Sequence, residues 1–234
     1  MKILAIDTSA LVASAALCKN DTPIAVYSQK SGLTHSETML PIIRDLLVNT
    51  GWKMDAIDML AVSHGPGSFT GVRIGISLVK GLAFGKNKIC VGVSTLEAMA
   101  RNLLPFCQDA LICPVMDARR GQLYTATFAV HGNTLLRLTP DRLEAAETLA
   151  SELLEFDKPV YFTGDGYDIM KNLSLSYAVD IPKTARWQSG YGVALAALEA
   201  YRQKPDPSIF TDTALKPRYL RPSGAERKME MRSR

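Results

Sequence analysis

The sequence is poor in aromatic residues and in cysteine, and it contains no long apolar run. Aromatic side chains make up 7% of its 234 residues. No apolar run reaches the ~20 residues that a membrane-spanning helix needs. An acid at position 7 also interrupts the apolar start of the chain, where a signal peptide would continue. These features predict a cytoplasmic protein that does not bind membranes.

Several kinds of chemical site are also missing from the sequence. The four cysteines, Cys18, Cys90, Cys107 and Cys113, lack Cys-x-x-Cys spacing, so we expect buried thiols and neither a zinc site nor a disulfide framework. No P-loop, nucleophile elbow or zinc-protease signature occurs. The three histidines are scattered along the chain. We therefore predict no catalytic residue and no metal site.

The net charge of +4 comes from the C-terminal end of the chain. Residues 216–234 contain seven basic and two acidic side chains, so the remainder carries a net charge of about −1. A short basic tail can bind nucleic acid through phosphate charge. Because Tyr219 is the only aromatic residue among these charges, a solvated terminus is the favoured interpretation.

Hydrophobic residues at 47% and charged residues at 21% predict a packed globular protein, and the apolar periodicity predicts the α/β class. In the first half we expect three strands at residues 2–7, 12–17 and 23–28. A helix at 35–49, a strand at 59–63, a helix at 68–84, a strand at 88–91 and a helix at 95–103 follow. In the second half we expect three strands at residues 111–116, 123–128 and 135–138. A helix at 143–156, a strand at 159–163 and a helix at 193–201 follow.

Both halves thus begin with three strands, which predicts a duplicated actin-like ATPase (ribonuclease H-like) fold with a mixed sheet in each subdomain. A simple doubly wound sheet is the alternative. We expect subdomains at 1–103 and 104–205 and a basic tail at 206–234. Five prolines between positions 105 and 182 predict that the second subdomain is the less regular one.

The most specific motif is Ser-His-Gly-Pro-Gly-Ser-Phe-Thr-Gly-Val-Arg-Ile-Gly, over residues 63–75, directly after an expected strand. A proline between two glycines is typical of a tight turn, and the serine or threonine after it can cap the next helix. Free amides at a helix start can bind an anion, but the glycines can equally serve only the turn and close packing. The motif residues that we single out are Gly65, Pro66, Gly67, Ser68, Thr70, Gly71 and Arg73.

Acids follow the first strand of each half, at Asp7 and Asp117. Actin-like ATPases use an acid-x-Gly loop at these places, so that backbone can approach phosphate and an acid can hold magnesium. Both loops here lack that glycine. Asp7, Thr8 and Ser9 remain candidates for contact with a nucleotide phosphate, and a turn-stabilising aspartate is the favoured alternative.

The motif at 65–75 resembles the TsaB family, also called YeaZ, and the resemblance extends in order through residues 3–9, 92–96, 116–120 and 217–221. It implies a role in forming threonylcarbamoyladenosine beside the anticodon of tRNAs that read codons beginning with adenine. It also implies partners: a TsaD-like catalytic paralogue, a TsaE-like ATPase, a second copy of the chain when alone, and tRNA only indirectly.

The same resemblance implies that the chain is not itself an enzyme. TsaD carries a His-x-x-x-His metal pair at the positions that hold Thr95 and Met99 here, and neither residue supplies a ligand for a hard or borderline metal. The resemblance thus implies a non-catalytic subunit that keeps TsaD in a competent state. Such a subunit requires no cofactor and binds ATP or ADP with magnesium at most weakly. The alternatives are an independent small-molecule kinase or ATPase, and a direct tRNA-binding module.

The helix expected at 68–84 has apolar residues over about 220° of its circumference. Packing against a single sheet would bury only part of this apolar arc. With the resemblance, this surplus predicts a protein–protein interface on the first two helices. The alternative is that the helix at 35–49 covers the surplus. The residues expected at the interface are His35, Met39, Ile43, Ile74, Ile76 and Ser77.

Overall fold

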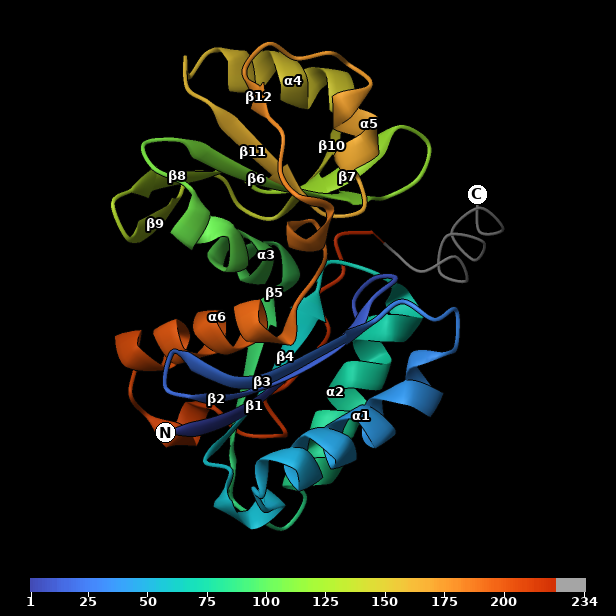
Figure 1. Ribbon diagram of the computed structural model, residues 1–234, viewed down its shortest axis with the longest axis vertical. Helices are drawn as coiled ribbons and strands as arrows, with labels where there is room; N and C mark the ends of the chain where they lie inside the picture. Colours follow the sequence, from blue (N-terminus) through green and yellow to red (C-terminus); the bar gives the residue numbers. More distant parts are fainter. Residues whose placement is uncertain (222–234) are drawn as a thin grey trace, which may run out of the picture.

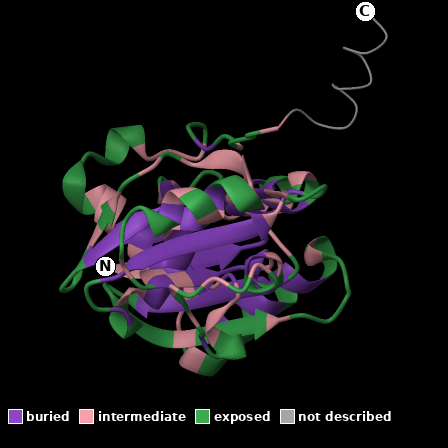
Figure 2. Ribbon diagram, turned by 90° about the horizontal axis from the view of Figure 1, so that it is seen from above, coloured by how far each residue is buried: buried purple, intermediate pink, exposed green. Residues whose placement is uncertain are grey.

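The computed structural model describes residues 1–221, which form two lobes, each built around one sheet (Figure 1). Residues 222–234, most of the expected basic tail, lie outside the described part. The strands at the centre of the molecule are largely buried (Figure 2). Within the described residues, no helix combines the length and the apolar character that crossing a membrane requires.

The first lobe has a five-stranded sheet in the order β3-β2-β1-β4-β5. Its strands are β1 (Lys2–Asp7), β2 (Ala13–Lys19), β3 (Thr22–Gln29), β4 (Met59–Gly65) and β5 (Ile89–Ser94). The first three pair antiparallel, while β4 and β5 run parallel to β1. One face packs against α1 (His35–Thr50) and α2 (Phe69–Ala83). The order and types of these elements are as the sequence predicts.

The second lobe repeats this plan, but its second and third strands are each broken in two. Successive parts of β6 (Leu111–Asp117) pair with β8 (Phe128–His131) and β7 (Gln122–Thr125). These pair in turn with β9 (Thr134–Arg137) and β10 (Arg142–Ala145). On the other side of β6, β11 (Val160–Thr163) and β12 (Ala178–Val179) follow in parallel. Two short strands thus take the place of each longer strand.

The sequence predicts a helix at 143–156, but the helix in the structure begins later. Residues 143–145 belong to β10, which pairs with β7, and the helix α4 spans Ala146–Leu154. The pairing partner lies about twenty residues upstream, so the local pattern does not reveal it. The short helix α5 (Tyr167–Lys171) and strand β12 were likewise not expected.

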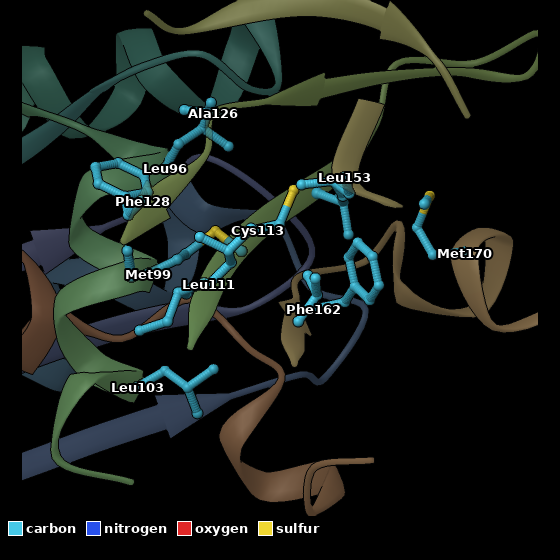
Figure 3. Packing of buried hydrophobic residues seen from close by; sticks show 14 of the residues in the cluster. Leu96, Met99, Leu103, Leu111, Cys113, Ala126, Phe128, Leu153, Phe162 and Met170 are labelled. Carbon is cyan, nitrogen blue, oxygen red and sulfur yellow. The ribbon is translucent and has the colours of Figure 1, made fainter. Parts of the chain in front are cut away.

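Two helices cross between the halves of the chain. The helix α3 (Thr95–Leu103) follows the first sheet, yet Leu96, Met99 and Leu103 pack in the core of the second lobe (Figure 3). The helix α6 (Gly190–Gln203) follows the second sheet, yet it covers the first sheet on the face opposite α1 and α2. Both helices lie between the two sheets and pack on each other (Figure 1). The packing therefore crosses the division expected at 103/104.

Candidate functional site

A cleft of about 570 Å³ opens between the lobes, where β1, β4 and β6 end. The first lobe contributes the residues after β1 and the Gly-Pro-Gly turn after β4. The second lobe contributes the turn after β6 and Asp165 after β11. The third wall is the C-terminal strap, as we call residues 215–221, which runs back across the cleft. The cleft is thus built by loops from both lobes and by the end of the described chain.

The carboxyl group of Asp7 does not face this cleft. It is fully buried and accepts hydrogen bonds from the Ser9 amide (2.8 Å), the Ser9 hydroxyl (2.6 Å) and the Ser63 hydroxyl. Burial raises its pKa, and these hydrogen bonds act in the opposite direction. The Thr8 hydroxyl donates a hydrogen bond to the Gly71 carbonyl oxygen (2.7 Å). Of the three nucleotide-contact candidates, only Ser9 lines the cleft, so that hypothesis stays a prediction and rests on Ser9 alone.

The bond from the Ser9 amide to the Asp7 carboxylate, two residues back, is the turn-stabilising arrangement. It fixes the loop after β1 against the Gly-Pro-Gly turn, because the Ser68 amide donates to the Ser9 carbonyl at 2.7 Å. Ser68 is the N-cap of α2, and its hydroxyl accepts from the Gly71 amide at 3.2 Å. The motif therefore places the start of α2 at the edge of the cleft.

Gly67 is required by this turn. Its φ is +155°, and a Cβ at this position would overlap the Ser9 carbonyl oxygen. We expect Gly67→Val to lower the free energy of unfolding by about 2 kcal/mol, as overpacking against a backbone atom does. Thermal unfolding of the two proteins measures this. An unchanged midpoint would show that the turn accommodates a side chain.

The C-terminal strap is bonded to both lobes. The Arg218 amide donates to the His64 carbonyl (2.7 Å) at the end of β4, and an Arg221 guanidinium nitrogen donates to the Ala118 carbonyl (3.0 Å) after β6. Leu215 anchors the strap in the core of the first lobe. Burial, and then the charge of Arg218, lowers the pKa of the His64 imidazole to about 4, so this histidine is neutral at physiological pH.

Arg73 joins the strap to α2. Its Nε donates to the Tyr219 hydroxyl at 2.7 Å, and its guanidinium lies 3.8 Å from the centroid of the Phe69 ring. The Phe69 and Tyr219 rings stack with centroids 4.7 Å apart. Sequence reasoning singled out Arg73 but missed Phe69 and the strap as site residues. The available signal was the resemblance over residues 217–221.

On the second lobe, the turn after β6 carries two arginines in left-handed backbone conformations, Arg119 (φ +72°) and Arg120 (φ +58°). The Asp117 carboxylate accepts from the Arg119 amide at 2.7 Å. The neighbouring Asp165 accepts from the Asp117 amide at 3.3 Å, and burial raises the pKa of Asp165. Left-handed residues other than glycine cost conformational energy, so the surrounding structure holds this turn in place.

Half of the residues expected at the interface are buried, although one of them, Met39, also lines the groove described below. Met39, Ile43 and Ile76 are only 1%, 2% and 4% exposed, because they pack between the helices and the first sheet. The apolar surplus on α2 is therefore partly covered by its own chain. The residues that stay at the surface lie along a groove of about 610 Å³ between α1 and α2, which includes His35, Leu40, Arg73, Ile74 and Ser77.

Thr95 and Met99 both lie inside the molecule, with exposures of 0% and 2%. The Met99 side chain packs in the core of the second lobe (Figure 3). Across residues 1–221, no group of three or more histidine, cysteine or acidic side chains is arranged to hold a metal ion. At the two positions that the resemblance relates to a metal pair, this chain thus has a buried threonine and a methionine that packs in the core.

Three comparisons relate this architecture to known proteins. The family model described as TsaD, tRNA N6-adenosine threonylcarbamoyltransferase, matches residues 25–229. The tRNA threonylcarbamoyladenosine biosynthesis protein TsaB of Bacillus subtilis is 38% identical over 173 residues, covering 74% of this chain and 75% of that protein. The TsaB of Escherichia coli is 39% identical over 128 residues, covering 55% of each chain.

Among solved structures, YeaZ from Pseudomonas aeruginosa superposes with a TM-score of 0.76 at 23% identity, covering 94% of this chain and 99% of that one. This likeness concerns the fold. The ethanolamine utilization protein EutJ from Carboxydothermus hydrogenoformans has a TM-score of 0.52 at 14% identity, covering 83% of this chain and 90% of that one. The α/β class and the duplicated actin-like plan predicted from the sequence are confirmed.

Proposed function

The chain belongs to the TsaB family of tRNA threonylcarbamoyladenosine biosynthesis proteins, and from this membership we propose that it supports the threonylcarbamoyl transfer to tRNA without catalysing it. A TsaD-like transferase performs the chemistry in this proposal, and a TsaE-like ATPase joins the complex. The chain would hold the transferase in a competent state and form a homodimer when alone. It would meet tRNA only through the complex, in the cytoplasm, and need no cofactor for this role.

The observation that carries the proposal is the burial of the groups that an actin-like ATPase would expose. The Asp7 carboxylate is fully buried by its bonds to Ser9 and Ser63, so it offers no oxygen to a magnesium ion in the cleft. Thr95 and Met99, at the positions that the resemblance relates to the metal pair of TsaD, are also buried. These features favour a binding role over the alternative of an independent kinase or ATPase.

The groove between α1 and α2 supports the partner role. Leu40 at its edge is 54% exposed, and Ile74 remains partly exposed on the α2 side. An apolar groove flanked by Arg73 and Ser77 has the character of a protein interface, with an apolar centre and a polar rim. We therefore place the contact with the transferase, and with a second copy, on this groove.

Reconstitution tests the proposal. The chain and a TsaD-like transferase from the same organism would be incubated, separately and together, with threonylcarbamoyl adenylate and tRNA. We expect incorporation into tRNA to require the transferase and to rise at least about tenfold when this chain is added, which corresponds to about 1.4 kcal/mol of barrier. Turnover of adenylate or ATP by this chain alone, lost in an Asp7→Ala variant, would instead establish an independent enzyme.

A further inference from the structure

The groove between α1 and α2 has an arginine at its rim that the structure holds in one orientation. Arg73 is exposed, yet its guanidinium lies 3.8 Å from the centroid of the Phe69 ring and 5.7 Å from that of the Tyr219 ring. Its Nε donates to the Tyr219 hydroxyl at 2.7 Å. An exposed arginine without such contacts samples many rotamers, so these contacts lower the entropy that binding a partner would cost.

The two terminal nitrogens of this guanidinium are unused. Within residues 1–221, they donate no hydrogen bond, and Arg73 forms no ion pair with a carboxylate. A guanidinium held through Nε can still offer its terminal nitrogens to the oxygens of a carboxylate. The groove supplies no such group, because no acidic side chain is among its described lining residues. The counter-charge therefore has to come from the protein that docks.

The two helices also offer no spare carboxylate to a second copy of the chain. α2 contains no acidic residue, and α1 contains two, Glu37 and Asp45. The Glu37 carboxylate accepts hydrogen bonds from the amide and the hydroxyl of Thr34, at 3.1 and 2.7 Å. The Asp45 carboxylate pairs with Arg44 at 3.0 Å. In a two-fold dimer the same patch meets itself, so Arg73 would face a groove that also lacks a free acid.

We propose that Arg73 determines which protein the groove prefers: it binds a carboxylate of the TsaD-like transferase, and the lack of such a group disfavours a second copy. This inference rests on the proposed docking of the transferase in the groove. Tyr219 is a positioning residue, because it acts on the partner only through Arg73. Specificity of this kind arises when one partner satisfies a charge and the other leaves it unpaired.

Two affinities of the full chain test the inference. Sedimentation equilibrium measures self-association, and titration calorimetry measures binding of a TsaD-like transferase from the same organism. We expect Arg73→Gln to weaken transferase binding by about tenfold, since it removes a charge-assisted bidentate contact, and to leave self-association within about twofold of the unaltered chain. Added salt should weaken transferase binding more for the unaltered chain than for this variant.

Tyr219→Phe tests the positioning role. It keeps the ring that stacks on Phe69 but removes the hydroxyl that accepts from Arg73. We expect transferase binding to weaken by about threefold, with no further loss when the change is added to Arg73→Gln, because the hydroxyl then has no guanidinium to hold. The control is Arg202→Gln, which removes an exposed arginine on α6 paired with Asp21 at 3.7 Å and should leave both affinities unchanged. Circular dichroism checks that all variants are folded.

Three results would overturn the inference. One is the absence of transferase binding by the unaltered chain, which would overturn the proposed function as well. Another is transferase binding that Arg73→Gln leaves unchanged, in which case the proposed function stands and the inference alone is wrong. The third is an equal loss of both affinities in Arg73→Gln, since Arg73 would then not discriminate between partners. An effect of Tyr219→Phe that persists in the Arg73→Gln background would overturn the positioning role.

Discussion

Replacing Ile76 by glutamate is expected to unfold the protein, whereas Ile74→Glu, two residues earlier on the same helix, should leave it folded. Ile76 is 4% exposed and packs in the core between α2 and the first sheet. Burying an unpaired carboxylate there should cost about 4 kcal/mol or more, a large part of the stability of a typical domain. Ile74 lines the groove between α1 and α2, where a charge stays hydrated.

The two variants also separate the core from the docking surface. We expect Ile74→Glu to retain a native circular dichroism spectrum but to lose self-association and capture of a TsaD-like transferase, measured by size exclusion with light scattering. Ile76→Glu should lose the cooperative thermal transition. If Ile74→Glu still dimerises and captures the transferase, the groove is not the interface. If Ile76→Glu stays folded, the packing described for α2 is wrong.

A second large effect is expected at Gly71. A Cβ there would overlap the Thr8 carbonyl oxygen, because α2 approaches the loop after β1 at this point. Thr8 in turn donates its hydroxyl hydrogen to the Gly71 carbonyl at 2.7 Å, so neither segment can move without breaking that bond. We expect Gly71→Ala to lower the free energy of unfolding by about 3 kcal/mol through overpacking.

Gly81 provides the matched control on the same helix. It is exposed, and a Cβ there would meet no atom within 4 Å. Because alanine is the better helix former, Gly81→Ala should stabilise the protein by about 0.5–1 kcal/mol. Thermal unfolding should therefore shift in opposite directions for two identical substitutions ten residues apart. A lowered midpoint in both variants would mean that general helix distortion, and not the contact with Thr8, sets the cost.

The order of elements in the first lobe could be predicted from the sequence because each has a local signal. The apolar run of β1, the helical spacing of α1 and the Gly-Pro-Gly turn before α2 are visible within a few residues. The start of α6 was placed too late, because Gly190 and Gly192 resemble loop residues. They are there for close approach: a Cβ on Gly190 would lie 2.7 Å from the Ala16 amide nitrogen, and one on Gly192 would overlap the Ala98 carbonyl oxygen.

The candidate site was predictable only in part, because local sequence signals do not reveal contacts between distant residues. The motif after β4 was identified correctly as a turn that leads into a capped helix. Which residues it faces depends on distant contacts, such as Arg73 with Tyr219, 146 positions apart. The helical wheel gave the width of the apolar surface on α2 but not its orientation, so it could not tell that Ile76 is internal and Ile74 is not.

The exchange of α3 and α6 between the lobes sets the order in which the chain can mature on the ribosome. The sheet that α6 covers is complete at Ser94, roughly 100 residues before α6 begins. At about 5–20 residues per second, synthesis of this interval takes on the order of 5–20 s. Throughout it, the face that carries Ile3, Ala61 and Val91 lacks its cover. The apolar face of the first sheet therefore stays uncovered midway through translation, and the first lobe closes only when α6 has been made.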